Sequence, residues 1–129
     1  MKNIFVPLIF FVSLLSACQT NENSLTFVGE GENWLAEVTV HQTKGEETYQ
    51  IQLKNKGISI EENGAFHYHV ASKNNGVVDF GVRDATLNQE GIYHTKLFSA
   101  NSPSTSTEDE LLIKVEWSDT SESFDLRSK

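Results

Sequence analysis

The chain has 129 residues, with 18 acidic and 10 basic side chains and a formal net charge of −8. An acidic surface repels phosphate groups, so the composition argues against binding to nucleic acid or to anionic lipid headgroups. The length fits one small domain. The only cysteine, Cys18, excludes an intrachain disulfide, so stability has to come from an apolar core.

The N-terminal segment has the layout of a secretion signal. A lysine precedes an apolar run over residues 4–15, and two small residues then lead into Cys18. The run is shorter than the roughly 20 apolar residues of a spanning helix. We therefore expect residues 1–17 to be a cleaved signal peptide. The alternatives are a membrane anchor and an ordinary secretion signal that happens to end near a cysteine.

The run Leu15-Ser16-Ala17-Cys18 resembles the lipobox of bacterial lipoproteins. This resemblance implies that Cys18 carries a thioether-linked diacylglycerol and becomes the first residue of the mature chain. Two acyl chains suffice for stable anchoring, whereas one chain binds a membrane only marginally. The expected location is the cell membrane, with the protein lipid-anchored on the extracytoplasmic side. Residues 18–23 are then a short acylated tether.

From residue 24 onwards, apolar and polar residues alternate with a period of two, which is typical of β-strands with one buried face. Turns rich in glycine and asparagine separate these runs, and no long stretch has helical periodicity. The pattern predicts strands over residues 24–29, 33–42, 47–55, 57–61, 66–72, 77–83, 92–99, 110–118 and 121–126.

Regular short strands separated by turns indicate a sandwich or a barrel. The inward rows are bulky and aromatic, which favours a filled sandwich over a barrel with a ligand cavity. The prediction is an all-β domain over residues 24–129, an immunoglobulin-like antiparallel β-sandwich of about seven to eight strands. Trp34 is expected to be a large core anchor, placed just after a turn that contains Gly29 and Gly31.

A second resemblance concerns the start of the mature domain. The run Phe27-Val28-Gly29-Glu30-Gly31-Glu32-Asn33-Trp34, followed by Ala36-Glu37-Val38, resembles the opening of many short lipoproteins of Gram-positive, Bacillus-type bacteria. Those proteins are similar in size, in lipobox and in having a strand-rich mature domain. Most have no assigned activity, so the resemblance implies a location and a fold but no chemistry. Cys18 is the only functional residue that it carries over.

The His-x-His pair, His67 and His69, is the sharpest candidate for chemistry. Residues two apart on a strand project from the same face, so both imidazoles can reach one zinc or copper ion. His94, expected on a neighbouring strand, is the candidate third ligand. In the alternative interpretation, the apolar residues between them face the core and the histidines stand in solvent.

Acidic residues are the other candidates, because paired carboxylates can serve a glycosidase or a calcium site. The chain contains no calcium-loop pattern, no Gly-x-Ser-x-Gly motif and no phosphate-binding glycine loop. We therefore expect neither an enzyme nor a cofactor. The acidic candidates are Glu108, Asp109 and Glu110 before one strand, and Asp119, Glu122 and Asp125 near the C-terminus.

These observations favour a non-catalytic binding or accessory module outside the cell. It would be attached to the membrane through Cys18, with an envelope protein that the sequence does not identify as a possible partner. The first alternative is a zinc- or copper-binding protein that uses His67 and His69. The weaker alternative is a hydrolase that acts on cell-wall material.

Overall fold

The computed structural model describes residues 23–43, 46–57, 64–73, 78–95, 98–100 and 105–129. The expected signal peptide, Cys18 and nearly all of the tether lie outside these residues, as does most of the strand predicted over residues 57–61. No helix in the described part of the chain is long and apolar enough to cross a membrane.

The described chain is built from antiparallel strands, so the all-β prediction is confirmed. The strand bounds lie close to those expected from the alternation of polar and apolar residues. The strands are β1 (Asn23–Glu30), β2 (Trp34–Thr43), β3 (Glu46–Asn55), β4 (Phe66–Ser72), β5 (Asp79–Ala85), β6 (Ile92–His94), β7 (Phe98–Ala100), β8 (Glu110–Trp117) and β9 (Thr120–Ser128).

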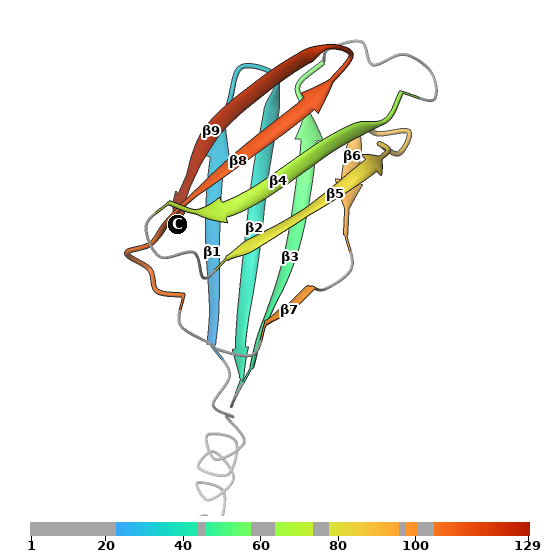
Figure 1. The fold of residues 1–129 in the computed structure, drawn as a ribbon. Helices are drawn as coiled ribbons and strands as arrows, with labels where there is room; N and C mark the ends of the chain where they lie inside the picture. The colour runs from blue at the N-terminus through green and yellow to red at the C-terminus, as the bar shows by residue number, and fades with distance from the viewer. Residues whose placement is uncertain (1–22, 44–45, 58–63, 74–77, 96–97, 101–104) are drawn as a thin grey trace, which may run out of the picture.

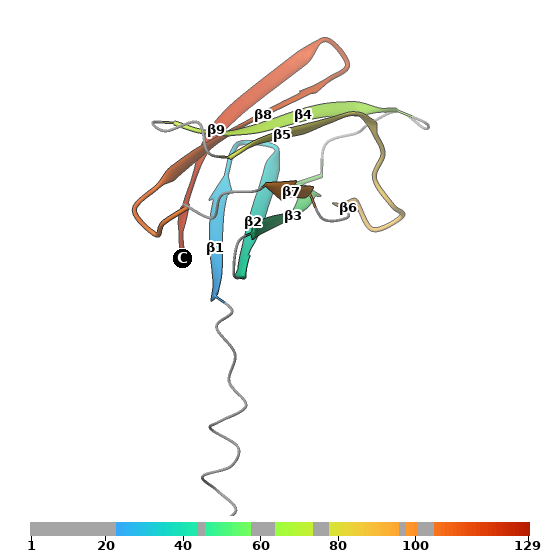
Figure 2. The same cartoon turned by 60° about the horizontal axis from the view of Figure 1, so that its bottom comes forward.

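The strands form one continuous sheet in the order β5-β4-β8-β9-β1-β2-β3-β6, with β7 also paired to β3. The sheet folds back on itself, so that the half β5-β4-β8-β9 faces the half formed by β1, β2, β3, β6 and β7 (Figures 1 and 2). An immunoglobulin-like sandwich has two separate sheets. Here backbone pairing continues from β9 to β1, so that finer prediction is not confirmed and the sheet is closer to a nearly closed barrel.

The sheet turns from one half to the other where β9 meets β1. Only two residue pairs join these strands, and just beyond them a Cβ atom at Gly29 would collide with the backbone carbonyl of Asp125. The carboxylate of Glu122 on β9 accepts hydrogen bonds from the backbone N–H (3.1 Å) and side-chain amide (2.9 Å) of Asn33 in the β1–β2 turn. Gly29 thus allows β1 and β9 to approach closely at this corner, and Glu122 links β9 to the β1–β2 turn.

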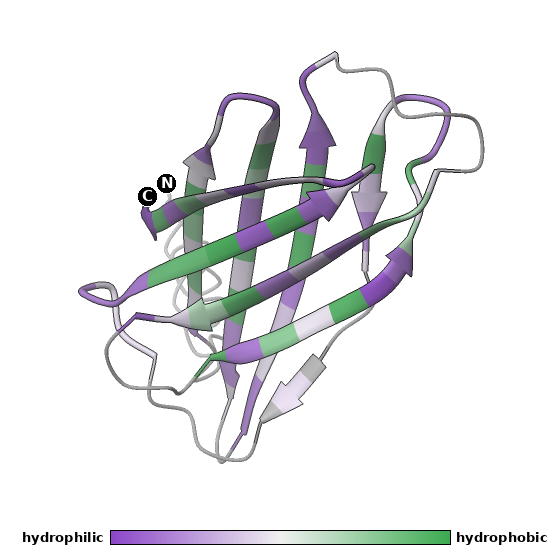
Figure 3. Ribbon diagram, turned by 45° about the horizontal axis from the view of Figure 1, so that its top comes forward, coloured by the Kyte–Doolittle hydropathy of each residue, from purple (hydrophilic) through white to green (hydrophobic). Residues whose placement is uncertain are grey.

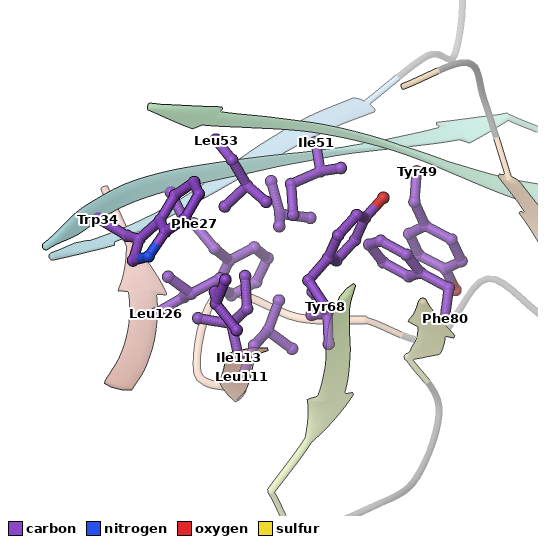
Figure 4. Close-up of a cluster of buried hydrophobic side chains, with 14 of the residues drawn as sticks. Phe27, Trp34, Tyr49, Ile51, Leu53, Tyr68, Phe80, Leu111, Ile113 and Leu126 are labelled. Atoms are coloured by element: carbon purple, nitrogen blue, oxygen red, sulfur yellow. The ribbon is translucent and has the colours of Figure 1, made fainter. Parts of the chain in front are cut away.

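Hydrophobic and hydrophilic residues alternate along the strands (Figure 3), and the buried hydrophobic side chains fill the space between the two halves. Trp34 is fully buried at one end of the core, with ring centroids 4.9 Å from Phe66 and 5.7 Å from Trp117. At the other end, Tyr49 of β3 stacks on Phe80 of β5 at 5.5 Å (Figure 4). This stack bridges the side of the barrel on which no described backbone pairing links β5 to β3 or β6. The burial of Trp34 and its ring contacts with Phe66 and Trp117 confirm its predicted role as a core anchor.

The strand predicted over residues 92–99 is divided into two short strands on the same partner. Strand β6 pairs with Gln52–Lys54 and strand β7 with Glu47–Tyr49, at the two ends of β3. Between them, the backbone N–H of Thr95 donates to the carbonyl of Ile51 at 3.2 Å. The prediction of extended chain at both ends of this range is confirmed, but the prediction of one continuous strand is wrong.

Glu47 is a fully buried carboxylate that ties β3 to the segment leading into β8. It accepts hydrogen bonds from the Tyr49 hydroxyl (2.6 Å), the Thr105 hydroxyl (2.7 Å), the Thr105 backbone N–H (3.1 Å) and the Gln42 amide (2.7 Å). Burial alone would raise the pKa of Glu47, but these donors outweigh it and the pKa lies below its usual value. Glu47 is therefore held as an ion.

Replacing Glu47 with glutamine should lower the free energy of unfolding at pH 7 by about 2–3 kcal/mol, because buried donors lose an ionised acceptor. The folded-state pKa of Glu47 is lowered, so its contribution is complete above the ordinary value of 4.5 and is lost as the pH falls through the folded-state pKa. Urea denaturation at pH 7 and at successively lower pH measures both effects. The exposed neighbour variant Glu46→Gln should change stability by less than about 0.5 kcal/mol. Equal stability of Glu47→Gln and the unmodified chain at pH 7 would contradict the assignment.

Candidate functional site

The outer face of β4, β5 and β8 carries two rows of polar side chains, set by strand register. One row runs from Glu116 on β8 to His67 on β4. The next row runs from Lys114 on β8 through His69 on β4 to Gly81 on β5. Directly opposed residues on antiparallel strands have Cβ atoms about 4.5–5.5 Å apart. The three strands therefore bring these polar groups onto one continuous patch.

His67 and His69 lie on this face because the apolar residues between and around them occupy the core side of β4. Tyr68 is buried, whereas both histidines are exposed, so the pair shares one face as the alternation predicted. The rings do not converge on a common point in the described contacts. His69 Nε2 lies 2.6 Å from a carboxylate oxygen of Asp79 on β5. His67 instead binds the backbone of β5.

The contact of His67 with β5 stabilises a β-bulge. Residues Phe66 and Tyr68 pair with Ala85 and Val82, so one extra residue is inserted on the β5 side. Asp84, in the bulge, has a left-handed backbone with φ of 59°, and its N–H donates to His67 Nδ1 at 3.0 Å. The side chain of His67 thus supplies an acceptor to a backbone group that the irregular pairing leaves out of the ladder.

This hydrogen bond also determines which nitrogen of the neutral His67 ring carries the proton. A nitrogen that accepts a hydrogen bond carries no proton, so the neutral ring of His67 has its proton on Nε2. Neither nitrogen then offers a free lone pair to a metal ion while the bond to Asp84 persists. The His67–His69 pair is therefore not prearranged as a two-ligand site in this conformation.

His94 is not brought to the histidine pair. Its neighbour on β6, Tyr93, points into the core, where its hydroxyl lies 3.3 Å from that of Tyr68 on β4. His94 therefore points away from the core on one half of the sheet, and His67 and His69 do so on the other. Burial and the hydrogen bond with Tyr93 raise the pKa of Tyr68, so the Tyr68 hydroxyl is held in its neutral form. Within the residues that the structure describes, no three histidine, cysteine or acidic side chains are grouped to hold a metal ion.

A shallow hollow of about 440 Å³ lies over the row that ends at Gly81. A Cβ atom at Gly81 would lie 2.5 Å from the backbone carbonyl of Tyr68, so the close approach of β4 and β5 excludes a side chain there. The ring of His69 lies beside this position, with its Cδ2 3.1 Å from where such a Cβ atom would be. Its lining residues are His67, Tyr68, His69, Gly81, Val82, Arg83, Lys114 and Glu116.

A second hollow of about 470 Å³ adjoins the first and shares His67 and Glu116 with it. It extends to the β8–β9 turn, where Ser118 and Asp119 both have positive φ values, of 42° and 61°. Such values are those of the tight two-residue turns that join β-hairpins. Three of the six other lining residues bear hydroxyls, namely Ser118, Thr120 and Ser121; the remaining three are Ala65, Trp117 and Asp119.

Arg83 has an unusual electrostatic position for a chain with an excess of acidic residues. Most of the other described lysines and arginines contact carboxylates, as Lys73 does with Asp125 at 3.1 Å. Arg83, like Lys54, makes no ion pair with any residue that the structure describes. The first hollow is thus lined by two permanent positive charges, Arg83 and Lys114, against one negative charge, Glu116.

Four of the six acidic candidates from the sequence have structural partners for their carboxylates. Glu110 and Asp125 both contact Lys73, at 3.5 and 3.1 Å. Asp109 accepts a hydrogen bond from the Ser106 N–H at 3.0 Å, and Glu122 holds Asn33 as described above. These contacts spread the carboxylates over loops, the sheet surface and the sheet corner.

Sequence reasoning missed Gly81, Arg83 and Lys114 as parts of the polar patch. The alternation of Phe80 and Val82 did indicate that Gly81 and Arg83 point away from the core. The order of β5, β4 and β8 was the missing information, since β8 lies far from the other two in the chain. Comparison of the chain with protein-family models, curated proteins and solved structures gives no match in any of the three.

Replacing His67 with alanine should expose the backbone N–H of Asp84, because its acceptor is removed. A hydrogen bond of about 1.4 kcal/mol corresponds to a tenfold change in an equilibrium, so exchange of this amide with deuterium should accelerate about tenfold. Residue-resolved hydrogen exchange by NMR measures the effect. His69→Ala is the matched control and should leave this amide unchanged. Unaltered exchange in His67→Ala would show that the bulge does not depend on the ring.

Proposed function

We propose that the chain is a non-catalytic binding or accessory module, held on the extracytoplasmic side of the cell membrane by a diacylglycerol on Cys18. The observation that carries this proposal is the polar patch of β4, β5 and β8. Its two adjoining hollows are open to solvent, whereas apolar side chains fill the interior of the sheet. Such an arrangement suits recognition of a ligand or an envelope protein at the surface.

The position at which strand β1 begins supports the same proposal. Strand β1 begins at Asn23, only five residues after Cys18, at the opposite end of the body from the β8–β9 turn (Figure 1). A flexible chain spans about 5–6 Å times the square root of its residue number, so such a tether is short. With a lipid on Cys18, the β8–β9 turn and the second hollow beside it would lie at the end of the body away from the anchor, accessible to a partner.

The finer features of the proposal are the protein class and the scaffold. The lipobox and the segment over residues 27–38 support assignment to the small lipoproteins of the Bacillus type. The folded-back sheet would serve as the layered scaffold that immunoglobulin-like sandwiches provide. Side-chain packing between Tyr49 and Phe80, in place of described backbone bonding, supports that layered view.

The two alternatives require changes in the described contacts. A zinc or copper site on the histidine pair requires His67 to release the Asp84 N–H. It also requires ligands other than His94, which points away from the core on the opposite half of the sheet. A cell-wall hydrolase requires a pair of carboxylates free to act on substrate, whereas Glu110, Glu122 and Asp125 are bound to neighbouring side chains or to backbone. The binding module needs no such rearrangement.

Replacing Cys18 with serine should abolish incorporation of labelled palmitate and leave an uncleaved precursor, since serine offers no thiol for acylation. Labelling of growing cells, followed by membrane fractionation and mass spectrometry, measures both results. Asn21→Ser, in the tether, is the control and should be labelled normally. Undiminished palmitate labelling of Cys18→Ser would refute the anchor.

A further inference from the structure

We propose that the hollow over Gly81 binds an anionic group of a ligand, a phosphate or a carboxylate, and that Arg83 is its principal donor. This inference rests on the proposed binding function and assigns a chemistry to it. The hollow is called the anion hollow below, and its central row is Lys114, His69 and Gly81.

Arg83 has the properties of an anion-binding residue. Its guanidinium presents a planar set of N–H donors that matches the oxygens of carboxylates and phosphates in pairs. It lines the anion hollow and has no ion pair with the described residues. Bulges commonly redirect a side chain, and Arg83 immediately precedes the bulge residue that His67 holds. The bond from Asp84 to His67 thus positions the main donor.

Lys114 and His69 provide further positive and polar groups beside Gly81. Lys114 is opposite His69 in the register, and its ammonium is 3.8 Å from the Glu116 carboxylate. That separation is long for a charge-assisted hydrogen bond, so the ammonium can contact a second anion. His69 keeps its Nε2 on Asp79 at 2.6 Å, which fixes the ring at the edge of the hollow.

The carboxylates near the anion hollow lie outside its central row. Glu116 is opposite His67 in the neighbouring row, and Asp79 is already bound to His69. Asp84 contributes its backbone N–H to His67 and is not among the lining residues. A net charge of −8 repels anions from most of the surface. An anion would therefore bind at this positively charged hollow in preference to the rest of the surface.

Gly81 lines the anion hollow without a side chain of its own, beside the ring of His69. It is opposite His69 in the register, and any larger residue would place its Cβ 2.5 Å from the carbonyl of Tyr68. The ligand can thus approach the backbone of β5 between His69 and Arg83. The hydroxyl-lined second hollow adjoins this position, so it can accommodate a polar continuation of the same ligand.

The test is an NMR titration of the full-length ¹⁵N-labelled chain in a non-ionic detergent. Inorganic phosphate and citrate are added separately, with sodium chloride at matched ionic strength as the reference. We expect saturable shifts of the Gly81 and Arg83 amide signals with at least one of the two anions and none with chloride. The anion that binds more tightly identifies phosphate or carboxylate as the preferred group.

The variants give the deciding comparison. Arg83→Gln should raise the dissociation constant about fivefold or more, and Arg83→Lys should have an intermediate effect because it keeps the charge but loses the paired donors. Arg127→Gln removes the same charge from β9, where Arg127 contacts Glu110 at 3.2 Å, and should bind as the unmodified chain does. The dispersion of the amide spectrum verifies folding of each variant.

Absence of saturable shifts at Gly81 with both anions would overturn the proposal, as would equal weakening by Arg83→Gln and Arg127→Gln. Neither result would alter the palmitate labelling of the unmodified chain, which tests the anchor. Conversely, anion binding at Gly81 in a chain that labels equally with and without Cys18 would overturn the anchor and leave the anion hollow standing. The two failures are therefore distinguishable.

Discussion

The contact between the two halves of a single folded sheet is the interaction on which the other features depend. Trp34 packs against Phe66 and Trp117, so side chains from β2, β4 and β8 meet across the interior. Once alternate residues are committed to that interior, their neighbours are necessarily on the surface. The same apolar rows that stabilise the fold therefore place His69 and Lys114 side by side on the outer face of β4 and β8. The position of the polar patch thus follows from core packing, and the identity of a few residues sets its chemistry.

The side of the barrel away from the β9–β1 corner relies on side chains. Tyr49 links β3 to β5 through ring stacking and donates its hydroxyl to Glu47, which in turn holds Thr105. Aromatic packing is tolerant of small sliding movements, whereas a buried ion with four donors is not. The combination fixes the position of one half relative to the other although no described backbone ladder closes the barrel there. The polar patch is thus built on the half of the sheet that depends on these contacts.

Local alternation predicted most of the fold, because a period of two determines both the strands and their buried faces. It also placed His67 and His69 on one face, and it identified Trp34 as a core anchor. Three features depended on contacts between distant segments. The break between β6 and β7 follows from pairing with β3, and the opposite placement of His94 follows from Tyr93 meeting Tyr68 across the core. Arg83 could not be recognised because a one-residue bulge on β5 and the order β5-β4-β8 are properties of the assembled sheet.

The bulge has a consequence for the length of β5. Up to Val82 the inward positions are even-numbered, and in a regular strand Asp84 would come next and bring a carboxylate into the apolar interior. The additional residue instead turns Ala85 inward, where it is buried opposite Phe66. Removing Asp84 would restore regular pairing with Ala85 still turned inward, but it would take away the backbone N–H that donates to His67. Removing a residue of β5 outside the bulge would instead exchange the two faces of the strand beyond the deletion. Loops elsewhere in the molecule can gain or lose residues at modest cost, whereas a change of length in β5 alters either the bulge or the buried face.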